Sequence, residues 1–376
     1  MPTIEAGDLS QLDANLESVP NAPGVFLVSV REGSPYLART GLLRRRLLRL
    51  LRERDKPSRL LNLREAVTRI EYWLAGSRLD SSMRMYDLAR RYFPGDYLEY
   101  LHLHSPPYLK VLLSNEFPRC QITTHLGRSK SLYYGPFRNR AAAEFFENEF
   151  LDLFQMRRCQ EDLEPAPSHP GCIYGEMGKC LRPCQQAVSR EEYAGEVDRV
   201  VDFLRTDGSS LLDTVIASRD RLSADMEFEQ AARQHKRAEK IAEMIRARDP
   251  MARHVDHLHA IAVTPSSCPG ATDIAFVNAG YWYGLFQLNF DIGEGKPVPL
   301  DRRLREMIEA QAWTPTTSRE RQERLAILAR WFYSGWCDGE LFLFDDWARP
   351  PFRRVVNAIS RAARGEPHEK IGDARQ

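Results

Sequence analysis

Apolar positions near the start of the chain follow first the spacing of strands and then that of a helix. Residues 24–30 form an apolar run after a proline, residues 32–34 favour a hairpin turn, and residues 36–38 favour a short second strand. Residues 42–52 then place leucines on one half of a helical wheel and arginines on the other. This order predicts a β-hairpin that leads into an amphipathic helix.

The pattern of the remaining chain alternates between short strands and helices. It predicts strands over residues 97–104, 108–113, 120–125, 260–264, 273–278 and 281–290, and helices over 83–94, 141–156, 189–204, 211–248, 300–311 and 318–335. The stretch 211–248 divides into two helices near residues 224–225, and a polar tail follows a Trp- and Phe-rich segment at 336–347. The fold class expected from this order is α+β.

Composition places the chain among globular proteins. Its 376 residues are enough for two or three domains with their own cores, and 43% of them are hydrophobic. The longest apolar runs are far shorter than a membrane span, and residues 1–20 carry acids without the apolar segment of a signal peptide. We therefore expect a cytoplasmic protein without a membrane partner, in which thiols stay reduced.

Four of the seven cysteines fall in one short segment: Cys159, Cys172, Cys180 and Cys184. The residues around them are rich in Gly and Pro, and too few are apolar to position four thiols by packing. Four thiolates from a short loop are the ligand set of a tetrahedral zinc ion or of an iron-sulfur cluster. Spacing alone leaves zinc and iron-sulfur open, and unligated or disulfide-bonded cysteines are the remaining alternative.

The net charge of +1 is uninformative by itself, but positive charge concentrates early in the chain. Residues 39–69 contain eleven Lys or Arg against three acids. Such a patch fits contact with nucleic-acid phosphates, and a solvated helix face is the other interpretation. Arg46 breaks the helical pattern because it falls within the leucine stripe, where an unpaired cation is costly. Periodicity therefore marks Arg46 as a site residue that needs a partner or a cleft.

The cysteine segment and the residues before it also resemble a known family. Tyr-Tyr-Gly-Pro-Phe at 133–137, the helix that follows, and the cysteine order ending in Cys-Leu-Arg-Pro-Cys at 180–184 resemble UvrC, the incision subunit of bacterial nucleotide excision repair. The resemblance covers roughly residues 20–245. It implies that the four cysteines named above hold a 4Fe-4S cluster, with zinc as the alternative.

The β-hairpin followed by an Arg-bearing helix resembles a GIY-YIG nuclease domain, which in UvrC relatives makes the 3′ incision. The resemblance places the family's two sheet tyrosines on Phe26 and Tyr36, its second glycine on Ala38, its lysine on Arg39 and its catalytic arginine on Arg46. Tyr36 and Arg46 are thus the expected remnant of the catalytic site. Phe26 lacks the hydroxyl of the family's tyrosine, and losing one acid–base group costs about 10²-fold or more in rate.

The resemblance also assigns a metal-binding glutamate to the helix at 83–94, where this chain has Met85. A thioether does not bind a hard, oxygen-seeking Mg2+ ion, and Asp87 points to a different helix face. Phosphodiester hydrolysis needs a metal to neutralise the charge of the transition state. We therefore expect most or all catalysis to be lost, with Mg2+ as a cofactor only if the nuclease is active. The basic surface is expected to keep its DNA contacts: Arg39, Arg44, Arg45, Arg49 and Arg52.

Residues 226–233 resemble the UVR motif, the helical hairpin through which UvrC docks on a matching hairpin of UvrB. A two-helix hairpin cannot bury its apolar stripe alone, so pairing with a partner hairpin is also a physical expectation. Packing of the hairpin on its own chain is the alternative. Phe228 is the expected anchor for UvrB or another UVR-hairpin protein.

Four regions are expected along the chain. They are a degenerate GIY-YIG-like domain at 1–96, a connecting sheet and cysteine-rich cluster region at 97–188, a helical region with the UVR hairpin at 189–249, and a truncated UvrC-like C-terminal region at 250–376. The resemblance implies that the RNase H-like and helix-hairpin-helix domains of full-length relatives do not fit in the last region, so we expect no 5′ incision.

The function expected is that of a UvrC-like excision repair protein that binds double-stranded DNA and UvrB with an impaired nuclease site. The first alternative is an active Mg-dependent endonuclease that makes a single 3′ incision at damaged DNA. The second is a zinc-stabilised scaffold unrelated to DNA, for which salt would leave DNA affinity unchanged or affinity would be absent.

Overall fold

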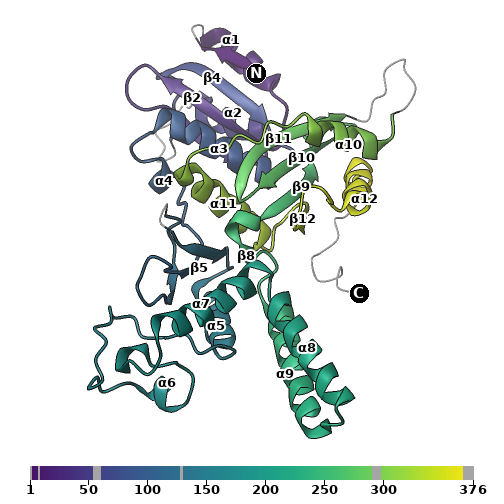
Figure 1. Cartoon of the computed structure of the whole chain (residues 1–376). Coiled ribbons are helices and arrows are strands. Elements are labelled where there is room, and N and C mark those ends of the chain that lie inside the picture. The colour runs from purple at the N-terminus through teal and green to yellow at the C-terminus, as the bar shows by residue number, and fades with distance from the viewer. Residues whose placement is uncertain (1, 7–8, 54–60, 128–129, 290–297, 367–376) are drawn as a thin grey trace.

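The computed structural model describes residues 2–6, 9–53, 61–127, 130–289 and 298–366, and the strands in these ranges form three four-stranded antiparallel sheets. An N-terminal sheet and a C-terminal sheet lie together in the upper part of Figure 1, above a middle sheet and a long helical hairpin. The expected α+β class is confirmed. Within the described ranges, every helix is too short or too polar to cross a membrane.

The N-terminal sheet has the strand order β1-β4-β2-β3, so β3 is an edge strand. Its region comprises β1 (Thr3–Glu5), α1 (Leu9–Glu17), β2 (Gly24–Val30), β3 (Tyr36–Thr40), α2 (Leu43–Leu51), β4 (Val67–Leu74) and α3 (Arg78–Tyr92). Because side chains alternate across a strand, Phe26 and Tyr36 pack on the α1 and α2 side, whereas Leu27 and Leu37 pack on the α3 side. The predicted hairpin and amphipathic helix are both present, although Leu42 is exposed.

The middle sheet has the strand order β6-β5-β7-β8. Its region comprises β5 (Tyr108–Val111), β6 (Cys120–Thr123), β7 (Leu132–Gly135), α5 (Arg140–Leu151), α6 (Ile173–Glu176), the 3-10 helix η1 (Pro183–Gln185), α7 (Arg190–Arg205) and β8 (Arg253–His254). Phe146 and Phe150 of α5 pack in the core of this region with Phe203 of α7. Ser189 and Glu192 form a capping box at the start of α7, where the predicted helix over 189–204 begins.

The helical hairpin consists of α8 (Ser209–Ala224) and α9 (Phe228–Ala247), which agree with the predicted pair. It projects away from the rest of the molecule at the lower right of Figure 1. The chain then returns to the middle sheet, where β8 pairs with β7. The hairpin is therefore anchored at its base and free at its tip.

The C-terminal sheet has the strand order β11-β10-β9-β12. Its region comprises the 3-10 helix η2 (Val255–His257), β9 (His259–Pro265), β10 (Ala271–Asn278), β11 (Tyr281–Asn289), α10 (Leu300–Glu309), α11 (Ser318–Phe332), β12 (Glu340–Phe344) and α12 (Phe352–Ala363). Helix α11 packs on α3 and so joins the C-terminal and N-terminal sheets. At this junction, the Tyr86 hydroxyl donates to Glu323 Oε2 at 2.6 Å, and both groups are buried.

The predicted strand over residues 97–104 is wrong. The chain there forms the short helix α4 (Tyr97–Tyr100) and a turn. The alternating apolar side chains serve a different purpose, because Leu98 and Leu101 pack into the core between the two joined sheets. The ring of Tyr100 also stacks on that of Phe93, with centroids 4.6 Å apart, which favours a compact turn over an extended strand.

The predicted polar tail is also wrong in part, because it contains α12. Val355, Ala358 and Ile359 recur at helical spacing and are buried against the C-terminal sheet. Helix α5 ends at Leu151, earlier than the predicted residue 156. Some predicted features lie outside the described residues, namely Arg54, Lys56 and Arg59 of the basic segment and the strand end at Phe290.

Candidate functional site

Arg46 and Tyr36 meet at the edge of the N-terminal sheet. Arg46 Nη2 donates to the Tyr36 hydroxyl at 2.9 Å, and both side chains are half-buried. Tyr36 is thus the partner that the position of Arg46 in the leucine stripe requires. Phe26 is fully buried behind them, with its ring centroid 6.0 Å from that of Tyr36. The site holds one phenol and one guanidinium, and the phenyl ring adds no hydrogen-bonding group.

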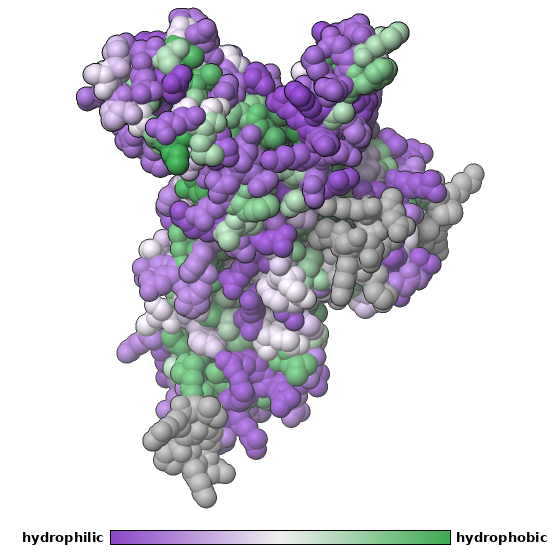
Figure 2. Space-filling view, turned by 90° about the horizontal axis from the view of Figure 1, so that it is seen from below, coloured by the Kyte–Doolittle hydropathy of each residue, from purple (hydrophilic) through white to green (hydrophobic). Residues whose placement is uncertain are grey.

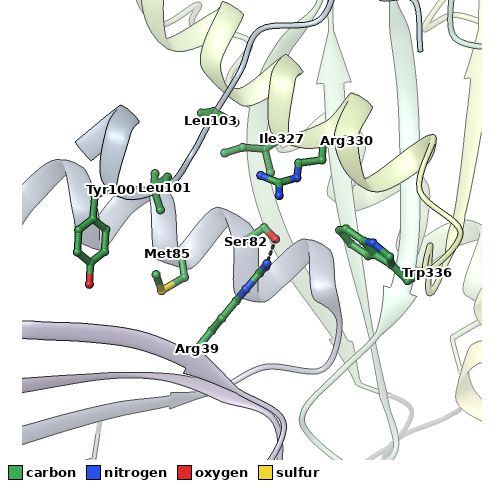
Figure 3. Close-up of a pocket in the computed structure, with 9 residues that line it drawn as sticks. All are labelled: Arg39, Ser82, Met85, Tyr100, Leu101, Leu103, Ile327, Arg330 and Trp336. Carbon is green, nitrogen blue, oxygen red and sulfur yellow. Dashed lines mark hydrogen bonds between the residues drawn. The ribbon is translucent and has the colours of Figure 1, made fainter. Parts of the chain in front are cut away.

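Met85 and Arg39 lie on the α3 side of the same sheet, where they line a pocket of about 170 Å³ (Figure 3). Residues from the N-terminal part of the chain and from the region of the C-terminal sheet line the pocket together. They are Arg39, Ser82, Met85, Tyr100, Leu101, Leu103, Ile327, Arg330 and Trp336. The Tyr100 hydroxyl donates to the Leu37 carbonyl oxygen. Burial and, less strongly, the nearby Tyr36 raise the pKa of Tyr100. Tyr100 thus lines the Met85 pocket and is hydrogen-bonded to the residue that follows Tyr36.

Among the residues that the structure describes, no carboxylate lines this pocket. Asp80 and Asp87 on the same helix line a separate cavity of about 460 Å³. Asp80 accepts from Arg84 Nη2 at 3.1 Å, and Asp87 accepts from Arg324 Nη2 at 2.7 Å. Burial raises the pKa of both carboxyls. These acids are held by arginines of another cavity and do not replace the carboxylate missing at Met85.

The arginines predicted to bind DNA do not form a single surface. Three are exposed at helical spacing along α2 and its C-terminal end: Arg45, Arg49 and Arg52. Arg44 Nε donates to the Val19 carbonyl oxygen at 2.7 Å, which ties that side chain to the segment before β2. Arg39 donates to Ser82 Oγ at 2.9 Å and belongs to the pocket on the α3 side. The α2 surface and the Arg39 pocket are two separate basic sites.

The cysteine segment forms a loop between α5 and α7, and all four of its cysteines are free thiols. Cys159 follows α5, Cys172 precedes α6, and Cys180 and Cys184 are buried. Burial raises the pKa of Cys180 to about 11, and the other three cysteines of the loop add to that rise. The loop thus brings four thiols into one another's electrostatic reach.

Arg157 gives an independent test of what these thiols fit. Its side chain is fully buried, and Nη1 donates to Cys159 Sγ at 3.3 Å. Its other bonds go to the carbonyl oxygens of Phe117, Cys159 and Glu161, and Nη2 has no partner among the described residues. No carboxylate in the described ranges pairs with it. Because an uncompensated buried cation is costly, the site fits an anionic group built from the neighbouring thiolates.

The spacing of the thiols bears on which group they fit. Within the part of the chain that the structure describes, no three His, Cys, Asp or Glu side chains are placed to hold a single metal ion. Zinc would require all four sulfurs about 2.3 Å from one point. In a 4Fe-4S cluster each thiolate binds a different iron, so the sulfurs stand further apart.

The tip of the α8–α9 hairpin exposes two large apolar side chains. Met226 has φ 62° and is 77% exposed, and Phe228, the first residue of α9, is 66% exposed. By contrast, Val215 and Ile241 further along the hairpin are buried. Seen from below, the molecular surface is mainly hydrophilic, with only small apolar areas (Figure 2). Apolar residues at the tip of a projecting hairpin are suited to a partner's apolar groove.

Several residues of these sites carry no signal in the sequence. Arg157 is one arginine among many, and only its burial and its contact with Cys159 set it apart. Arg330 and Trp336 reach the Arg39 pocket from the other end of the chain, and no local pattern links them to it. Tyr100 would have been accessible to sequence reasoning if its segment had been predicted as a turn.

Comparison with known proteins points to a single family. The family model described as the UvrC/Cho excinuclease middle domain matches residues 107–203. That range runs from β5 into α7 and includes the whole cysteine loop. No solved structure matches the chain.

Bacterial relatives named UvrABC system protein C extend the similarity beyond the middle sheet. The relative from Lachnospira eligens is 23% identical over 76% of this chain and 47% of its own length, and that from Dehalococcoides mccartyi is 25% identical over 73% and 45%. The relative from Moorella thermoacetica is 29% identical over 59% of this chain and 36% of its own length. The chain thus spans less than half the length of these relatives. Together with the middle-domain match, these similarities relate the chain to the UvrC family.

Proposed function

We propose that this chain is a nucleotide excision repair protein that binds double-stranded DNA and a UvrB-type partner, with a GIY-YIG-like site that is catalytically impaired. The observation that carries the proposal is the exposure of Phe228 at the tip of a projecting helical hairpin. Similarity to the UvrC family supports a role in excision repair, because the relatives are named as components of the UvrABC system.

The hairpin is the proposed docking element for UvrB. Its helices bury Val215 and Ile241 against each other or the body of the protein, whereas every residue from 223 to 230 is exposed. An exposed phenylalanine costs free energy in water, and burial in a partner recovers about 1.5–3 kcal/mol. A matching hairpin would bury Phe228 and Met226 in a four-helix arrangement.

The exposed face of α2 is the proposed contact with DNA phosphates. Arg45, Arg49 and Arg52 lie along one side of the helix, and the leucines on the other side hold the helix against the sheet. A rigid row of guanidinium groups supports phosphate binding because each releases condensed counterions from DNA. Affinity should therefore depend steeply on salt.

Catalytic impairment follows from what surrounds Met85. The described residues of its pocket include two arginines and no carboxylate, an environment that disfavours a bound Mg2+ ion. The nearest acids on the same helix, Asp80 and Asp87, are hydrogen-bonded to arginines and line another cavity. Without a metal, the charge developing on a phosphodiester in the transition state would fall to Arg46, the cation that the described residues place beside Tyr36.

The second candidate function is an active Mg-dependent endonuclease making a single 3′ incision. One observation favours it: Arg46 and Tyr36 remain hydrogen-bonded at 2.9 Å, the arrangement a cation and a phenol would keep in a working site. A carboxylate supplied by DNA-bound UvrB or by residues outside the described ranges would then have to hold the metal.

The cysteine loop is proposed to bind a 4Fe-4S cluster through Cys159, Cys172, Cys180 and Cys184, with zinc as the alternative. When bound, such a cluster would cross-link a loop that has few apolar contacts of its own. Arg157 would then face the thiolates as their counter-charge, with Nη1 already directed at Cys159 Sγ. Cys180 and Cys184, which are buried, would shield the group from solvent.

Retention on UvrB-loaded DNA tests the docking proposal. The full chain, purified without oxygen, is passed over immobilised duplex that carries one bulky lesion and bound UvrB. Wild type should be retained, and Phe228→Ala should weaken retention about 30-fold, as expected for an anchor residue. The matched control is Phe145→Ala, which removes another exposed phenylalanine, on α5. Equal retention of wild type and Phe228→Ala would refute docking through the hairpin tip.

The salt dependence of affinity for undamaged duplex tests the DNA-binding proposal. Replacing Arg45, Arg49 and Arg52 together by Gln should reduce the slope of log K against log salt by about 3. Arg140→Gln, an exposed arginine on α5, should leave the slope unchanged. A triple variant with the wild-type slope would show that α2 does not contact phosphates.

A further inference from the structure

Three arginines converge at the pocket between α3 and α11. Arg39 and Arg330 line it, and the guanidinium of Arg78 lies 5.1 Å from the ring centroid of Trp336, another lining residue. None of the three forms an ion pair within the described ranges. Asp338 lies beside them, but it accepts from the Arg78 backbone N–H at 2.6 Å and from the Trp331 indole at 2.8 Å. The pocket therefore carries an excess of positive charge.

The two lining arginines have donors to spare. Arg39 uses Nη1 on Ser82 Oγ, and Arg330 uses Nη1 on the His102 carbonyl oxygen at 3.3 Å. Figure 3 shows Arg39 rising from its strand and Arg330 coming from α11, with both guanidinium ends turned toward the same region. Each guanidinium carries five N–H donors in a fork that matches the oxygens of a phosphate.

The charges are held where they repel one another. Burial first, and then Arg330 and Arg78, lower the pKa of Arg39. Like charges at close range destabilise the fold unless an anion joins them. A bound anion would convert this repulsion into charge-assisted hydrogen bonds, which are the strong ones in proteins.

The size and walls of the pocket narrow the class of anion. Its volume of about 170 Å³ is below the ~300–1,000 Å³ of pockets that enclose a drug-sized ligand, so it admits a group and not a whole nucleotide. Trp336 and Tyr100 add aromatic surface, and Leu101, Leu103 and Ile327 add apolar surface. A phosphate inside with a sugar and base against an aromatic wall matches both features.

We propose that this pocket binds a terminal phosphate monoester of a nucleotide, with the attached sugar and base against Trp336. A monoester carries about −1.5 to −2 charge at neutral pH, which suits several arginines better than the single charge of a diester. A phosphate monoester of this kind is present at a 5′-phosphorylated strand end at a nick and in a free nucleoside monophosphate. Binding of a strand end rests on the proposed DNA-binding function, whereas binding of a free nucleotide does not.

Fluorescence anisotropy of the full chain with nicked duplexes tests the proposal. The two duplexes differ only in a 5′-phosphate or a 5′-hydroxyl at the nick. Wild type should bind the phosphate end about tenfold or more tightly, because hydrogen bonds to charged groups are the strongest net contributors. Arg330→Gln should abolish this preference. Arg353→Gln, an exposed arginine on α12, should keep it.

Two results would overturn the proposed phosphate site. One is equal affinity of wild type for the 5′-phosphate and 5′-hydroxyl duplexes. The other is an Arg330→Gln variant that has the melting temperature of wild type and still prefers the 5′-phosphate duplex. Competition by deoxyadenosine monophosphate separates the sources. If deoxyadenosine monophosphate displaces the 5′-phosphate duplex from wild type but not from Arg330→Gln, the phosphate site is supported and a free nucleotide is a sufficient ligand. If wild type prefers the 5′-phosphate duplex and this nucleotide does not compete, the phosphate site is supported with a strand end as its ligand.

The outcomes also separate this inference from the proposed function. If duplex binding depends on salt but is the same for both end groups, the phosphate site is refuted and DNA binding by α2 is not. If no duplex binding is measured, the DNA-binding proposal is refuted. The phosphate site is then tested by thermal melting with deoxyadenosine monophosphate. A melting temperature that rises in wild type but not in Arg330→Gln supports the pocket, and no rise in either overturns it.

Discussion

Arg46 Nη2 donates a hydrogen bond of 2.9 Å to the Tyr36 hydroxyl at the edge of the N-terminal sheet. The pair satisfies a half-buried cation that the leucine stripe of α2 would otherwise leave without a partner. A contact of this kind stabilises the fold whether or not the site is catalytic. On this account the pair serves the stability of the fold, and its effects should not depend on a metal.

Removing the tyrosine hydroxyl tests that view. Tyr36→Phe should lower the free energy of unfolding by about 1–2 kcal/mol, because Arg46 loses its partner while remaining half-buried. Urea denaturation with and without Mg2+ measures the effect, which should be equal in both. A loss of stability that appears only with Mg2+ present would point instead to a metal held at this site.

Restoring a carboxylate at position 85 should not restore a metal site. Met85→Glu places an acid in a pocket that already contains Arg39 and Arg330, so the new carboxylate should pair with an arginine. We expect a melting temperature at or above that of wild type, unchanged by Mg2+, and a loss of any preference for 5′-phosphate ends. Met85→Gln, which adds a similar neutral side chain, is the control. Stabilisation of Met85→Glu by Mg2+ would contradict this account of the pocket.

The buried cation at Arg157 predicts a coupling between one side chain and the proposed cluster. Without a cluster, Arg157 has no carboxylate partner among the described residues, so removal of iron should destabilise wild type more than Arg157→Met. Comparison of melting temperatures for iron-loaded and iron-free forms of both proteins gives the coupling directly. Iron content and the visible absorbance of the cluster confirm loading.

Arg140→Met, which removes an exposed cation of α5, serves as the control for this cycle. It should lose as much stability on removal of iron as wild type does. Equal losses for wild type and Arg157→Met would mean that the guanidinium does not compensate the thiolates. Zinc in place of iron in the purified protein would overturn the choice of cofactor.

His254 predicts a pH dependence of stability. Burial lowers its pKa to about 4, below the ordinary value of 6.5, so the folded state favours the neutral ring. Between these values the unfolded chain binds more protons, and stability falls as pH falls through the window. The loss should reach about 2–3 kcal/mol near pH 4.5. Urea denaturation across this range should show a shallower fall for His254→Gln.

The neighbouring His257 provides the control for that measurement. Its ring centroid lies 4.6 Å from that of His254, but the side chain is exposed. His257→Gln should therefore keep most of the wild-type slope. If His254→Gln shows the wild-type slope as well, other groups dominate acid destabilisation.

Much of the local structure could be predicted from the sequence because its signals are local. The leucine spacing of α2 and the Ser189–Glu192 capping box each depend on a few neighbouring residues, and both are present. The segment at 97–104 failed because its apolar alternation fits a strand equally well until Leu98 and Leu101 meet the C-terminal sheet. Helix α12 was missed although Val355, Ala358 and Ile359 carry its period.

The candidate sites were less predictable because they depend on contacts distant in sequence. Residue types and spacing identified Arg46 and the cysteine segment as candidate sites. They did not identify the hydrogen bond from Arg46 to Tyr36 or the guanidinium of Arg157 beside Cys159. The Arg39 pocket depends on Arg330 and Trp336, which reach it only because α11 packs on α3. No pattern within one element contains that information.

A nicking assay tests the central claim most directly. Wild type and Arg46→Ala are added with Mg2+ or Mn2+ to UvrB-loaded duplex bearing one bulky lesion, and the strands are resolved by length. The account predicts no nick with either protein. Phe228→Ala, run beside them, should be retained on the complex about 30-fold less well than wild type. A nick on the 3′ side of the lesion that disappears with Arg46→Ala would contradict it and establish a working nuclease.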